Sequence, residues 1–257
     1  MRPLRAFASY ALAVALLVSP HASAQVNVEP LRQQVAEDGF GARLRASLTS
    51  YAGNTRGLIL GGAALMGMRT HQHLAYVDLS SDYTRLNGEV SVAKWFAHAR
   101  HNYELLPWLW WEEFGQLESD RFRRVTVREL IGTGPRFGLY QTEAFEIFYG
   151  ASYMYEHTVL TTSDRRPVGQ GGVHRFNNYV AVTVRAHERV SLSSVTYFQP
   201  RFDRPSDLTL LSVSSAIFTI TDRLNSRVDA TVRYESVTPS DVRSGDLELK
   251  SSLELVF

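Results

Sequence analysis

The histidines of this sequence come closest to a catalytic or metal-binding arrangement. His71 and His73 are separated by one residue, so in a strand their side chains would point to the same face. Asp78 has the opposite parity and would point away from both histidines, which weakens a metal site. The sequence also contains neither a Gly-x-Ser-x-Gly elbow nor a His-Glu-x-x-His motif. We therefore expect no catalytic, metal or cofactor site, and a lipid-modifying hydrolase that uses rim histidines stays as an alternative.

The composition excludes several other kinds of site. The 257-residue chain contains no cysteine, so disulfides, thiolate metal sites, iron–sulfur clusters and cysteine nucleophiles are excluded. A formal net charge of +1 argues against a polybasic nucleic-acid binder. With 44% apolar residues the chain is too apolar to be disordered. Gly132-Thr133-Gly134 lacks the strand–helix context of a nucleotide-binding loop, so we interpret it as strand glycines.

The first 24 residues have the features of a removable export signal. Arg2 and Arg5 supply a positive start, residues 6–18 are almost entirely apolar, and Ala22-Ser23-Ala24 gives a small-x-small cleavage pattern. The apolar stretch is shorter than the roughly 20 residues that a membrane-spanning helix needs. We therefore expect cleavage of this segment and export from the cytoplasm.

Apolar and polar side chains alternate strictly near the C-terminus. In residues 247–257 the leucines share one face, and Glu248, Lys250 and Glu254 share the other. Residues 227–235 repeat the pattern. A soluble β-sandwich alternates as well. In an outer-membrane barrel, however, the apolar face meets lipid and the charged face lines the lumen.

Two further features favour the membrane barrel. Phe257 lies on the apolar face of the last predicted strand, and with Leu253 and Leu255 it resembles the C-terminal targeting signal of outer-membrane barrels. Aromatic residues also gather where strands should meet a membrane interface, at Trp108, Trp110 and Trp111. We therefore expect outer-membrane lipid, and the barrel-assembly machinery during biogenesis, as partners.

The pattern predicts an all-β fold, a single antiparallel transmembrane β-barrel of about 12 strands. It divides the chain into a signal peptide (1–24), a polar periplasmic lead-in (25–39) and the barrel (40–257). The strands are expected near 40–52, 56–68, 71–84, 88–104, 106–118, 121–140, 143–160, 174–187, 189–203, 206–221, 224–237 and 245–257.

The connections and one strand register carry further expectations. The odd-numbered connections should lie outside the cell and include the longest ones, over 161–172 and 238–245, whereas the even-numbered turns should be tight. In the strand over 121–140, Arg124, Thr126 and Arg128 are expected to point inward. Glu129 then falls on the lipid face, which requires a rim position or a β-bulge.

Charged side chains of the predicted inward faces are the candidates for lining the lumen. They are Arg124, Arg128, Glu146, Glu156, Arg227, Asp229, Arg233, Glu235, Glu248, Lys250 and Glu254. Side chains of both signs can pair across a narrow lumen and form a structural, salt-bridged interior. The alternative is a narrow pore, since barrels of about eight strands are filled and those of about 16–18 hold an aqueous channel.

Several short motifs extend this interpretation. They are Gly53-Asn54-Thr55, Tyr103-Glu104-Leu105, Glu118-Ser119-Asp120-Arg121-Phe122, the run from Arg128 to Gly134, and Gly150 followed by Glu156. With them the chain resembles the salt-induced outer-membrane proteins (YdiY-like), from about Tyr51 to Phe257. Pro135-Arg136 departs from the pattern, because a glycine or an aromatic residue is expected there. The resemblance implies an outer-membrane barrel of unestablished activity and supplies no catalytic residue.

The sequence therefore predicts an integral barrel of the Gram-negative outer membrane, structural or narrow and channel-like. By resemblance it is linked to osmotic or salt stress. The alternatives are the lipid-modifying hydrolase and a binding module that recruits a partner through the loop over 161–172.

Overall fold

The computed structural model describes Glu29 and residues 38–51, 57–86, 89–120, 123–161, 167–238 and 244–257. The predicted signal peptide and most of the predicted lead-in lie outside the described residues, as do residues 53–54 and 87–88 between predicted strands. In these described ranges no helix has the length and apolar character needed to cross a membrane.

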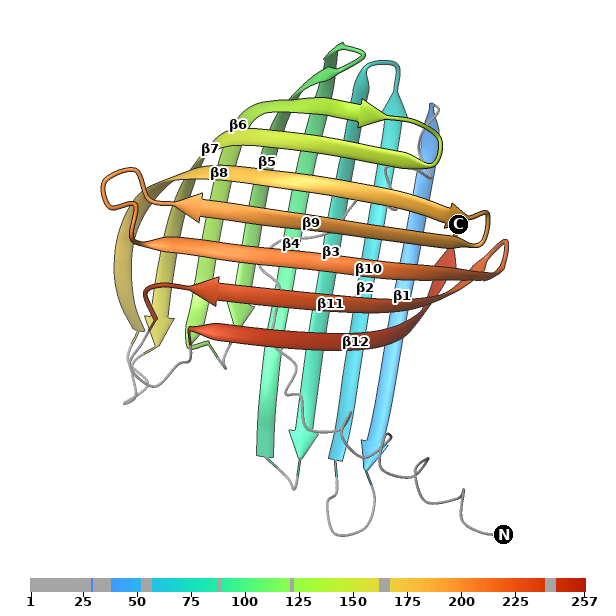
Figure 1. Ribbon diagram of the computed structural model, residues 1–257. Helices are drawn as coiled ribbons and strands as arrows, with labels where there is room; N and C mark the ends of the chain where they lie inside the picture. Colours follow the sequence, from blue (N-terminus) through green and yellow to red (C-terminus); the bar gives the residue numbers. More distant parts are fainter. Residues whose placement is uncertain are drawn as a thin grey trace, which may run out of the picture.

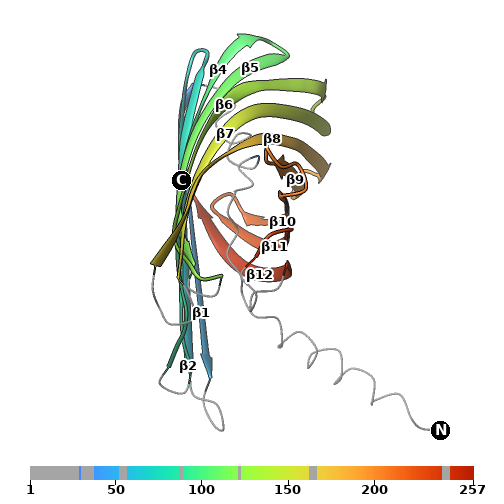
Figure 2. The same cartoon turned by 90° about the vertical axis from the view of Figure 1, so that its left-hand side faces the viewer.

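The described strands close into one antiparallel barrel, which confirms the predicted fold class. They are β1 (Gly39–Tyr51), β2 (Gly57–Thr70), β3 (His73–Leu86), β4 (Glu89–Leu106), β5 (Leu109–Asp120), β6 (Val125–Gln141), β7 (Phe145–Thr161), β8 (Pro167–His187), β9 (Val190–Pro200), β10 (Leu208–Thr221), β11 (Leu224–Glu235) and β12 (Gly245–Val256). Each strand pairs with its sequence neighbours, and β1 pairs with β12. Strands β1–β4 on one side of the barrel cross β8–β12 on the other side at a steep angle (Figure 1). The strands curve around the interior (Figure 2), as the strand tilt of a closed barrel requires.

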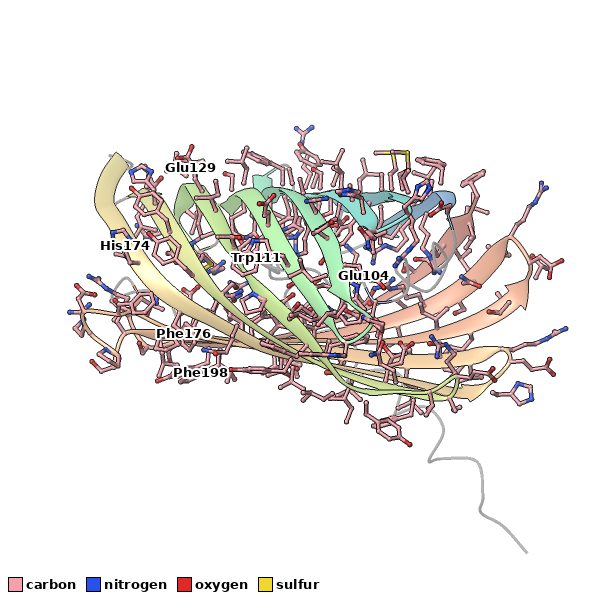
Figure 3. All side chains as sticks on the ribbon, turned by 90° about the horizontal axis from the view of Figure 1, so that it is seen from above. Glu104, Trp111, Glu129, His174, Phe176 and Phe198 are labelled. Atoms are coloured by element: carbon pink, nitrogen blue, oxygen red, sulfur yellow. The ribbon has the colours of Figure 1, made fainter. Side chains whose placement is uncertain are left out.

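Side chains alternate between the interior and the outer surface along the strands. In β5, Glu112, Phe114 and Glu118 are buried, whereas Glu113 and Leu117 between them are exposed. The outward set is largely apolar and includes Leu247, Leu249, Leu253, Leu255, Phe176 and Phe198, the last two labelled in Figure 3. An apolar outside around a charged inside is the reverse of a soluble protein, and it is the arrangement of a membrane barrel.

The connections differ at the two ends of the barrel. At one end the connections are tight: they have three residues between β6 and β7 (142–144) and two residues at His71-Gln72, Pro107-Trp108, Glu188-Arg189 and Asp222-Arg223. The long loop expected over 161–172 is wrong, because β8 already begins at Pro167 and pairs with Thr161 of β7. The glycines of this stretch suggested a loop, but pairing with β7 keeps residues 167–172 in the strand. The connection from β11 to β12 is long, as expected.

The start of β6 differs from the predicted register. Arg124 lies in the turn before β6, with a φ of 58°, and not on the strand. Val125 is buried and Thr126 is exposed, because the register shifts between Val125 and Val127. Beyond this bulge the predicted parity holds, so Arg128 faces the lumen and Glu129 faces outward.

The seam that closes the ring is short. Residues 43–46 of β1 pair with residues 253–256 of β12, and Ala42 exchanges two backbone hydrogen bonds with Phe257. By contrast, β1 pairs with β2 along its whole length, from Gly39 to Tyr51. The first and last strands therefore meet only at the end of the barrel that carries the two-residue turns.

Candidate functional site in the lumen

The lumen gathers most of the charged side chains that the sequence analysis selected. The buried ones are Glu156, Arg227, Asp229, Arg233, Glu248 and Glu254, and the half-buried ones are Arg128, Glu146, Glu235 and Lys250. Arg124 is the exception that lies in a turn. Leu253, Leu255 and Phe257, selected as a targeting signal, lie exposed on the outer surface.

A lysine cluster joins β3, β4 and β12 across the interior. The ammonium nitrogen of Lys94 lies 3.1 Å from a carboxylate oxygen of Asp82 and 3.4 Å from one of Glu248. Lys250 donates to the other oxygen of Asp82 at 2.8 Å. A cavity of about 100 Å³ lies beside these four side chains. A cavity of this size holds only a few water molecules.

A second cluster joins the two strands of the seam to β11. Arg227 pairs with Asp229 at 2.8 Å and with Glu254 at 3.3 Å. Arg43 reaches the same Glu254 at 2.7 Å, and Arg45 reaches Asp229 at 3.2 Å. Both β1 arginines thus hold carboxylates of β11 or β12. These contacts reinforce the short run of backbone pairing at the seam.

A third network lies toward the end with the longer connections. Arg128 contacts carboxylate oxygens of Glu118 at 3.2 Å, Glu235 at 3.3 Å and Glu156 at 3.4 Å. Arg175 continues the network, with a hydrogen bond to Glu156 at 2.8 Å. Strands β5, β6, β7, β8 and β11 are joined in this way. Charge is therefore balanced locally, as buried ionised groups require.

A fourth group surrounds Arg136, a residue that the sequence analysis noted only as a departure from the family pattern. Its guanidinium donates to both carboxylate oxygens of Glu29 at 3.0–3.1 Å and to the hydroxyl of Tyr179 at 3.2 Å. Glu112 lies 3.9 Å from Arg136 and 3.5 Å from Arg100. Arg136 is separated from Arg128 by an even number of positions on the same strand, so alternation could have predicted that it faces the lumen. Nothing in the alternation of the sequence indicated a role for Glu29.

Apolar side chains fill the interior next to Arg136. The cluster consists of Phe148, Tyr179, Ala181, Val195, Tyr197, Leu211 and Val213. Trp110 packs against it and meets the Phe148 ring edge-on at 5.6 Å. The expectation that Trp110 belongs to an interfacial belt is therefore wrong, because its parity on β5 turns it inward. Trp108 and Trp111 are exposed. This part of the lumen is packed as a protein core is.

His71 and His73 do not share a site. His71 is a turn residue beside Asp38, at 3.7 Å. His73 stacks on His101 of β4 on the outer surface, with ring nitrogens 3.0 Å apart, and Glu113 lies 3.6 Å from His101. Within the described part of the chain, no group of three or more histidine or acidic side chains could hold a metal ion.

Comparison with known proteins places the fold. A family model described as "Protein of unknown function, DUF481" matches residues 44–257. No curated protein matches the chain. The translocator domain of the autotransporter NalP from Neisseria meningitidis is 7% identical, with 89% of this chain and 91% of that chain covered and a TM-score of 0.52. The NanC porin is 8% identical, with 85% and 98% covered and a TM-score of 0.46. At these identities the likeness concerns the fold alone.

Proposed function

We propose that this chain, which belongs to the DUF481 family of proteins of unknown function, is an outer-membrane barrel with a structural role whose lumen is closed at rest. The observation that carries this proposal is the lysine cluster. Lys94 and Lys250 connect β3 and β4 to β12 across the inner faces of β1 and β2, and the cavity beside them measures only about 100 Å³. An open diffusion pore needs a continuous aqueous lumen.

The remaining luminal groups support the same conclusion. The network around Arg128 ties five strands together, and the apolar cluster around Phe148 packs the interior between β7 and β10. Breaking a buried ion pair costs about 3–5 kcal/mol, because it leaves an uncompensated charge. Opening a path would require several such pairs to separate at once.

The outer surface supports residence in the outer membrane. Exposed leucines of β12 face outward, and Trp108 and Trp111 lie beside a turn, where a membrane interface would meet the wall. Export by the predicted signal peptide, and recognition of Leu253, Leu255 and Phe257 by the barrel-assembly machinery, belong to this proposal. The resemblance of several motifs to those of salt-induced outer-membrane proteins supports a role for such a barrel under osmotic stress.

Conductance in planar lipid bilayers tests the closed lumen. Refolded protein in 1 M KCl (roughly a 3 Å Debye length) is expected to give no regular conductance steps, although its heat-modifiable migration shows that the barrel is folded. Regular steps, together with sugar permeation in liposome-swelling assays, would overturn the proposal.

The narrow-pore alternative keeps one observation in its favour. The cavity is lined by both cations and anions, and Lys250 keeps 32% of its side chain exposed. Small steps without any sugar permeation would favour this alternative over the structural role.

A further inference from the structure

Four ionised side chains meet in one buried part of the lumen. Arg100 belongs to β4, Glu112 to β5 and Arg136 to β6, whereas Glu29 precedes β1 in the chain. Among the described residues, these two arginines form ion pairs with Glu112, 3.5 Å from Arg100 and 3.9 Å from Arg136, and with Glu29, 3.0 Å from Arg136. The barrel strands alone therefore place two cations against one anion. Glu29 supplies the missing negative charge.

The wall presents Arg136 in the manner of a receptor for a carboxylate. Its side chain is 1% exposed, and the guanidinium carbon lies 3.9 Å from the centre of the Phe148 ring. Both terminal nitrogens reach the Glu29 carboxylate, which is the bidentate geometry that a planar guanidinium offers a planar carboxylate. The Tyr179 hydroxyl accepts a hydrogen bond from Arg136 and donates one to Glu112, so it fixes the orientation of the Arg136 guanidinium.

The neighbouring strand is shaped to admit this arrangement. Gly150 of β7 lies directly across from Tyr179 of β8, and a Cβ at Gly150 would overlap the tyrosine ring. The glycine leaves the ring in place between Arg136 and Glu112. Apart from Glu29, the site is thus built from residues of the barrel strands.

We propose that Arg136, with Arg100, Tyr179 and Phe148, forms a carboxylate-binding site in the lumen that Glu29 occupies as an internal ligand. A small external monocarboxylate takes the same place when Glu29 is removed. The single missing charge and the aromatic face favour a planar monoanion over a phosphate, which carries about −1.5 to −2. These side chains differ from the lysine cluster that carries the proposed function, so either proposal can fail without the other.

Acetate is the probe for this site, used with the full-length mature protein in detergent micelles. In Glu29→Ala, sodium acetate is expected to raise the Tm by about 2–4 °C relative to sodium chloride of equal ionic strength. The unaltered protein is expected to show no acetate-specific shift, because Glu29 already fills the site. Line broadening of ¹³C-acetate should appear in the Glu29→Ala protein alone.

Two further variants separate binding from folding. Glu143→Ala removes an exposed acidic side chain in the turn between β6 and β7, and it should remain insensitive to acetate. Glu29→Ala combined with Arg136→Lys keeps the positive charge but loses the two parallel hydrogen bonds of the guanidinium. Its acetate affinity should be at least about tenfold lower than that of Glu29→Ala alone. Phosphate should not reproduce the acetate shift. The proposal is overturned if Glu29→Ala does not respond to acetate, if phosphate or chloride acts equally well, or if the unaltered protein responds as strongly.

Discussion

A carboxylate oxygen of Glu129 lies 3.5 Å from Nδ1 of His157 on the outer surface of the barrel, where the two residues face each other across β6 and β7. Alternation placed Glu129 on the lipid face and required a rim position or a bulge. A bulge lies at the start of β6, but it precedes Glu129 and leaves this residue on the outer face. The Glu129 side chain is 55% exposed, close to that end of the strand (labelled in Figure 3).

Replacing Glu129 with alanine should therefore change the free energy of unfolding by less than about 1 kcal/mol, because exposed ion pairs contribute little. The matched substitution is Val228→Arg on the outward face of β11, which places a charge near the middle of the wall. It should cost about 2–4 kcal/mol. Urea unfolding in lipid vesicles measures both variants, and equal losses would contradict this placement of Glu129.

Asp82→Asn should destabilise the barrel by about 3–5 kcal/mol, because Lys94 and Lys250 would share Glu248 as their remaining cluster carboxylate. Asp222→Asn, in an exposed turn, is the matched control and should change stability by less than about 0.5 kcal/mol. Denaturant midpoints at constant m-value provide the comparison. Similar midpoints for the two variants would mean that the lysine cluster between β3, β4 and β12 does not stabilise the barrel.

Gly150→Ala should cost about 1–3 kcal/mol, because its new Cβ overlaps the Tyr179 ring and forces it away from Glu112. Gly62→Ala is the control: its Cβ meets nothing nearer than the backbone oxygen of Arg45 at 4.0 Å. It should be neutral or slightly stabilising, since alanine restricts the unfolded chain. Thermal unfolding in micelles distinguishes the two, and equal Tm values would refute this account of Gly150.

The connection between β9 and β10 should loosen only in acid. Hydrogen bonds from Arg201 hold the pKa of Asp203 below its ordinary 3.8. Burial raises the pKa of Asp207, but hydrogen bonds from Arg204 and the charge of Arg175 outweigh burial and leave the pKa below 3.8. A depressed pKa means that these contacts stabilise the loop at pH above about 4 and are lost as the pH falls through the lowered values.

Hydrogen exchange over residues 201–207, corrected for its intrinsic pH dependence, tests this expectation. Protection should persist from pH 7 to about 4 and disappear below. Asp207→Asn should reduce protection throughout that range, whereas Glu188→Gln in an exposed turn should have no effect. A loss of protection centred well above pH 4 would show that other groups hold the loop.

The fold could be predicted because a strand has a period of two, and that period is visible wherever one face meets lipid. Residues 245–257 show this most clearly, and the structure places β12 there. The tight turns at one end were likewise predicted from the spacing of the strands. Residues 167–172 were misjudged because their glycines favour a loop when considered alone, whereas pairing with β7 extends the strand.

The partners of the luminal charges could not be predicted in the same way. Parity states which side a residue faces, but strand tilt decides which distant residue it meets. Arg128 and Glu235 are far apart in sequence and 3.3 Å apart in the lumen. Glu29 belongs to no strand, so no period applied to it. The bulge between Val125 and Val127 also moved Thr126 off the predicted inward face, and Arg124 lies in the turn before the strand.

The brevity of the β1–β12 seam determines how the cylinder can come apart. Every other pair of neighbouring strands is consecutive in the chain, so the connecting turn or loop still holds the two strands together when their hydrogen bonds break. No such connection joins β1 to β12, and the hydrogen-bonded part of the seam includes only residues 42–46 and 253–257. The seam also joins the first strand to the last, so the sheet stays open until all the hairpins between these strands have formed. We therefore expect the seam to close last during assembly and to open first during unfolding.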